Sequence, residues 1–192
     1  MNKHADCVPK LMLLYNKTHS IRQNFDTLPE CFNYYHTLHK EYLLLLDNVR
    51  STYFKKSKED GKFFAEKCLT FYTIHFDKDE MDVSYADLYL FWNCIPFECD
   101  CIKLCLLLIP IILFQKVLFY KITDADKKFN SFVKFRDILK DIYEVVLKGE
   151  KKIDTTCPYM NTLLSNTLTK LKRLETTIQS VIEEKIKQKS NK

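Results

Sequence analysis

The residues best suited to chemistry are cysteines near the middle of the chain. Four of the eight cysteines share a C-x4-C-x-C-x3-C spacing: Cys94, Cys99, Cys101 and Cys105. Thiolates bind zinc in tetrahedral sites, but such sites are commonly built from paired C-x2-C motifs, which this spacing lacks. Free cysteine is also a small hydrophobe that is often buried, so a core position explains the cluster without an ion. We therefore predict no metal and no cofactor, with zinc as the alternative.

Histidines offer a second possible source of reactivity. His36 and His39 form an HxxH pair that would supply two further ligands to such a site, and Cys31 lies close enough in sequence to pair with them. Both histidines fall within an apolar stripe, where a packed imidazole is the more common outcome. A cysteine near histidines is not a family signature, and the chain has no GxSxG or HExxH motif. We predict no catalytic residues and a protein that is not an enzyme.

Glycine is scarce, and this excludes several kinds of site. The chain has two glycines, Gly61 and Gly149, where average usage would give about 13. Neither a GxGxxG fingerprint nor a phosphate-binding P-loop can be built from them. Hairpin-rich β folds also depend on glycine at tight turns. The composition therefore argues against the usual nucleotide sites and for helices joined by short polar loops. No motif is specific enough to assign the chain to a family.

The charge balance argues against nucleic acid as a partner. The formal net charge is +5, from 30 basic and 25 acidic residues that are mostly interleaved. Polyanion-binding proteins usually show a stronger and more clustered positive charge. Only the tail, KIKQKSNK, is clearly basic. We expect it to be a frayed, solvated end.

The spacing of apolar residues predicts an all-α protein. In residues 32–53 they recur every three or four positions, which is typical of an amphipathic helix. Similar patterns follow Pro9 and cover residues 63–72, 84–95 and 129–146, and a last helix opens near Pro158. Asp26, Thr27 and the TDADKK stretch read as helix starts. We predict an irregular bundle of about six or seven helices around a central apolar helix.

The most apolar stretch has two interpretations. Residues 104–115 are uncharged for 12 positions, whereas a membrane span needs about 20 apolar residues. Extending the stretch to residue 122 includes Lys116, which is costly at the centre of a bilayer. The flanks, acidic before and basic after, would suit a span. We prefer a buried central helix, because runs of this length are assigned first to protein cores.

The last helix carries an apolar seam close to a heptad repeat. We predict that this seam binds a protein partner through Leu164, Leu168, Leu171, Leu174, Ile178 and Val181. The chain would then consist of a helical domain, residues 1–157, and an amphipathic, coiled-coil-like C-terminal helix with a basic tail, residues 158–192.

The first 20 residues contain no apolar signal-peptide core and no small-residue cleavage site, so we expect reduced thiols and a cytoplasmic or nuclear location. These features predict a non-enzymatic helical interaction protein, an adaptor or subunit of a larger intracellular assembly. The alternative is a membrane-anchored protein with one span near residues 104–122 and a cysteine-rich segment beside it.

Overall fold

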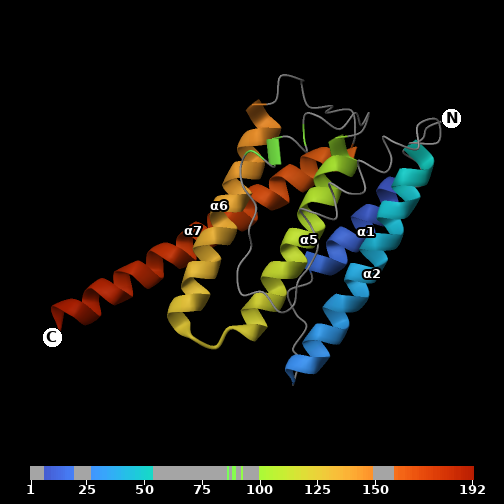
Figure 1. Cartoon of the computed structure of the whole chain (residues 1–192). Coiled ribbons are helices and arrows are strands. Elements are labelled where there is room, and N and C mark those ends of the chain that lie inside the picture. Colours follow the sequence, from blue (N-terminus) through green and yellow to red (C-terminus); the bar gives the residue numbers. More distant parts are fainter. Residues whose placement is uncertain are drawn as a thin grey trace.

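The computed structural model describes residues 7–19, 27–53, 86, 88–89, 92, 100–148 and 158–192. Within these ranges almost every residue is helical and none is in a strand, which confirms the predicted all-α class. The long helices there are α1 (Cys7–His19), α2 (Leu28–Tyr53), α5 (Asp100–Lys121), α6 (Ala125–Lys148) and α7 (Pro158–Ser190) (Figure 1). The part described thus holds five long helices, against the six or seven predicted for the whole chain. The helices predicted over residues 63–72 and 84–95 lie outside it, apart from residues 86, 88–89 and 92.

Capping residues explain where two of the helices begin. The Thr27 hydroxyl accepts a hydrogen bond from the backbone N–H of Glu30, 3.3 Å away, at the start of α2. The Asp124 carboxylate accepts one from the N–H of Lys127, at 3.0 Å, before α6. Both side chains satisfy a donor that has no partner within the helix. Pro29 lies in the first turn of α2, where its missing N–H costs nothing.

The helix α5 is packed between two helix pairs. It contacts α1 and α2, which also contact each other, and it contacts α6 and α7, which form a second pair. Figure 1 shows α1 and α2 on one side of α5 and α6 on the other. Residues 101–115 are buried without interruption, as expected of a helix that is apolar on every face. Leu107, Ile111 and Leu118 are each no more than 2% exposed.

By length and composition, α5 also resembles a membrane span. Its most apolar 18-residue window has a mean hydropathy of 2.2, and 89% of that window is buried within the protein. It is the one helix with this property in the described part of the chain. The core helix of a globular protein has the same length and composition, so hydropathy alone does not distinguish the two.

A proline in the middle of α5 is accommodated by a side chain from α2. In a regular helix, the carbonyl of Leu106 would accept a hydrogen bond from the N–H of residue 110. Residue 110 is Pro110, which has no N–H to donate. The buried hydroxyl of Tyr42 donates to the Leu106 carbonyl instead, over 3.1 Å. Tyr42 therefore supplies a donor that the α5 backbone lacks and joins α2 to α5 at that turn.

The basic side chain of Lys103, within this apolar helix, also finds its partner outside the helix. Lys103 is 5% exposed, and its ammonium group donates to the backbone carbonyl of Trp92 over 2.6 Å. The same nitrogen lies 5.0 Å from the centroid of the Trp92 ring. A carbonyl dipole and an aromatic face both favour a cation. These contacts offset part of the cost of burying the amine.

Candidate protein-binding site

Three residues of the seam predicted on the last helix are buried in the core, and the other three lie at its edge. Leu171 and Leu174 are each 7% exposed and Ile178 is 3% exposed, on a helix that packs against α6 and α5. Leu164, Leu168 and Val181 are half-buried. Leu171 and Leu174 belong to the same cluster of buried side chains as α5. At least half of this seam therefore serves the chain's own packing.

Ion pairs and a cation–π contact fix the direction of α7 across α6. Lys140 and Glu175 are 2.8 Å apart, and so are Lys185 and Asp126. The Lys185 ammonium also lies 4.8 Å from the centroid of the Phe129 ring. The hydrogen bond and charge of Lys185 lower the pKa of the Asp126 carboxyl. Each contact is exposed and individually weak, but together they hold α7 against α6 at two separate points.

The C-terminal part of α7 extends past α6 and away from the rest of the protein (Figure 1), and Lys185 ties it to α6. We call residues 179–192 the α7 end; from residue 182 onward every residue is exposed. Ile178, Ile182 and Ile186 are spaced four apart, so they lie along one stripe of the helix. Their exposure rises from 3% to 38% and then to 61%. The tail is helical through Ser190 rather than frayed, and an apolar stripe that starts in the core continues into solvent.

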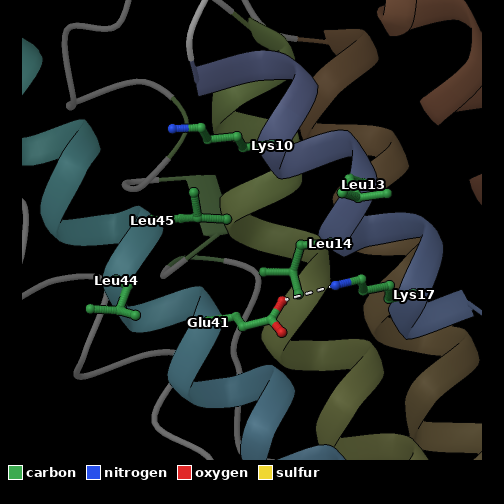
Figure 2. A pocket seen from close by; sticks show the side chains of 7 residues that line it. All are labelled: Lys10, Leu13, Leu14, Lys17, Glu41, Leu44 and Leu45. Atoms are coloured by element: carbon green, nitrogen blue, oxygen red, sulfur yellow. Dashed lines mark hydrogen bonds and ion pairs between the residues drawn. The ribbon is translucent and has the colours of Figure 1, made fainter.

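A second apolar feature lies between α1 and α2. Figure 2 shows this open pocket, which has a volume of about 260 Å³ and which we call the α1–α2 groove. Its lining residues are Lys10, Leu13, Leu14, Lys17, Glu41, Leu44 and Leu45. Lys17 and Glu41 point toward each other across it and form an ion pair at 3.4 Å (Figure 2). Leu13 and Leu44 are 59% and 70% exposed, so part of the lining meets water.

The buried cysteines do not form a metal site within the described residues. Cys31, Cys101 and Cys105 are buried, and the sulfur of Cys105 is 3.9 Å from that of Met12. Burial raises the pKa of Cys31 to about 11, which keeps it a neutral thiol at physiological pH. Among the described residues, no three or more His, Cys, Asp or Glu side chains are grouped as metal ligands. Residues 94 and 99 of the predicted cluster lie outside those residues.

The two histidines have different environments. His36 is exposed, whereas His39 is 9% exposed and stacks on Tyr42 with ring centroids 6.4 Å apart. Burial, and then the nearby His36, lower the pKa of His39. Its Nε2 atom has no hydrogen-bond partner among the described residues. The predicted packing within an apolar stripe is therefore confirmed for His39 and wrong for His36, which faces solvent. The lowered pKa of His39 favours its neutral imidazole.

The sequence carries a signal for the exposed leucines of the groove. Leu13 lies within the run Leu-Met-Leu-Leu, and Leu44 within four consecutive leucines. A helix turns by about 100° per residue, so four adjacent apolar residues cannot all face one core. On a helix that keeps one side open to solvent, one member of each run points outward, and in the structure these are Leu13 and Leu44.

Comparison with known proteins identifies no relative of this chain. No protein-family model, no curated protein and no solved structure matches the chain. Evidence for function therefore comes from the chain's own residues, contacts and charges.

Proposed function

We propose that this chain is a non-enzymatic helical interaction protein, an adaptor or a subunit of a larger intracellular assembly. It binds its protein partner through the C-terminal helix, at the α7 end rather than along the buried part of the seam. The observation that carries this proposal is the exposure of Ile182 and Ile186 on a helix that leaves the protein body. Val181, from the predicted seam, lies half-buried beside them.

Single exposed apolar side chains are common on protein surfaces and need no explanation. These two differ because they continue a buried stripe, one helical turn apart, on a helix that Lys185, between them in sequence, holds against α6. Apolar residues at positions i and i+4 are the usual anchors when a helix docks into a groove of a partner. A helix already formed and oriented by the Lys185–Asp126 pair also loses less conformational entropy on binding.

Site-specific photo-crosslinking in the native cell tests this proposal. A photoreactive residue at position 186 should capture a defined protein, because the Ile186 side chain would lie inside the interface. The matched control is position 147, since Leu147 is a comparably exposed apolar residue on α6, 50% against 61%. Adducts that are specific to position 186 support the proposal. The same adducts from both positions, or none from position 186, contradict it.

The composition of α5 favours one other function, a membrane-anchored protein with a single span near residues 104–122. Its support is a mean hydropathy of 2.2 over the most apolar 18-residue window of a 22-residue helix. In that case α5 would have to leave the four helices that cover it. Alkaline carbonate extraction separates the two proposals, because a spanning protein stays in the membrane pellet and an interaction protein is released.

A further inference from the structure

We propose that the α7 end of one copy of this chain docks into the α1–α2 groove of a second copy. This inference rests on the proposed function and names the partner as the chain itself. It joins two apolar surfaces that are exposed to solvent on the same molecule, a helix end and a groove. Each has the chemistry that the other would recognise.

The apolar parts match in kind and spacing. Ile182 and Ile186 are one turn apart in the exposed end of α7. The floor and walls of the groove are four leucines, two from α1 and two from α2: Leu13, Leu14, Leu44 and Leu45. Grooves between two helices commonly accept a third helix through such i, i+4 anchors. Docking would remove Leu13 and Leu44 from water together with the two isoleucines.

Although the α7 end is basic as a whole, the charged side chains beside its isoleucine stripe are complementary to those on the two walls of the groove. Lys10 and Lys17 lie on the same side of α1, two turns apart, at the rim of the groove. On the α7 end, Glu183 is only about 60° around the helix from Ile186 at 100° per residue. Glu183 would therefore lie beside the isoleucine stripe and face this basic rim. Lys189, close to the stripe on its other side, would face Glu41.

The arrangement requires two molecules. Figure 1 shows α1 and α2 on one side of α5, while the α7 end points away from the opposite side, beyond α6. The α7 end therefore cannot reach the groove of its own chain. A contact between two different surfaces is heterologous, so it can repeat from one copy to the next unless the rotation closes a ring.

Sedimentation velocity of the purified full-length chain, under reducing conditions to exclude disulfide dimers, tests this contact. We expect the unsubstituted chain to associate with rising concentration. Leu44→Asp in the groove and Ile186→Asp in the α7 end should each lower the association constant by about tenfold or more. The control Leu147→Asp, on an exposed face of α6 that the contact does not use, should associate normally.

Mixing the two variants gives the decisive result. Leu44→Asp keeps an intact α7 end and Ile186→Asp keeps an intact groove, so the mixture should form a one-to-one dimer and nothing larger. If Leu44→Asp still associates alone, the α7 ends pair with each other and the inference is wrong. If Ile186→Asp still associates alone, the grooves pair and the inference is equally wrong. An unsubstituted chain that stays monomeric also overturns it.

A charge-reversal pair covers the case in which Leu44→Asp fails to fold. Lys10→Glu and Glu183→Lys alter exposed residues, and each alone should weaken association by placing like charges together. The double variant should associate as the unsubstituted chain does, and failure to recover contradicts the proposed pairing. In the crosslinking experiment, capture of a different protein at position 186 would leave the proposed function standing and remove this inference. Absence of any adduct would remove both.

Discussion

Tyr42→Phe should destabilise the protein by leaving one buried carbonyl without a hydrogen-bond donor. The substitution removes the hydroxyl that donates to the Leu106 carbonyl over 3.1 Å and keeps the ring, which is 1% exposed. Because Pro110 has no N–H, the helix has no regular donor to replace it. A buried acceptor left unsatisfied costs about 1–3 kcal/mol. We expect that loss in the free energy of unfolding, measured by urea denaturation with far-UV circular dichroism.

A double-mutant cycle with Pro110→Ala isolates the cause. Alanine at position 110 restores an N–H that can donate to the Leu106 carbonyl, so Tyr42→Phe should cost less than about 1 kcal/mol in that background. The difference between the two costs is the coupling between the hydroxyl and the proline. An equal cost in both backgrounds would refute the reasoning, because the tyrosine would then stabilise the protein by some contact unrelated to the missing donor.

Three further predictions concern charged and titrating groups. Burial, and then Lys170, lower the pKa of Lys116 from 10.5 to about 8. Below pH 8 the amine is charged in the folded state, although its surroundings disfavour that charge. Lys116→Met removes this cost and should stabilise the protein by about 1 kcal/mol at neutral pH, a value discounted for partial exposure. That gain should shrink as urea denaturation is repeated at rising pH. The pKa of His39 is lowered from 6.5 in the folded state, so the unfolded chain binds the proton of this histidine more readily. Stability should therefore fall as pH drops through 6.5. His39→Phe should flatten that pH dependence. Lys185→Ala removes the contacts to Asp126 and Phe129. Because an exposed ion pair contributes little, global stability should stay nearly unchanged, while amide hydrogen exchange around residue 185 should become faster. Lys187→Ala is the unaffected control.

Helix type and position followed from local patterns in the sequence, because periodicity and capping act over a few residues. The starts of α2 and α6 agree with the predicted starts at Thr27 and in the TDADKK stretch. The role of the last helix depends on more distant contacts. Leu171 and Ile178 look the same in a seam that binds a partner and in one that packs on α6, since both need the same spacing. Only the tertiary arrangement places them in the interior and leaves Ile186 outside.

The same limit applies to the groove, whose two walls come from separate helices. Lys17 and Glu41 are 24 positions apart in the chain, yet form an ion pair across it. The run of leucines on α2 indicates an exposed leucine if α2 has a side open to solvent, but it cannot show that Leu13 of another helix is exposed nearby. A local pattern therefore finds outward-facing apolar residues, while their assembly into a groove requires the packing of α1 against α2.

The polar groups of α5 bear on whether this helix is a core helix or a span. The Leu106 carbonyl accepts a hydrogen bond from Tyr42 of α2. The Lys103 amine donates to the carbonyl of Trp92 and makes a cation–π contact with its ring. In lipid, a backbone carbonyl without its regular donor and a lysine amine must both find partners inside the protein. If α5 entered a bilayer without the elements that carry these two residues, it would lose both partners at once. A span would therefore have to bring Tyr42 and Trp92 with it, and this favours α5 as a helix that stays packed among its neighbours.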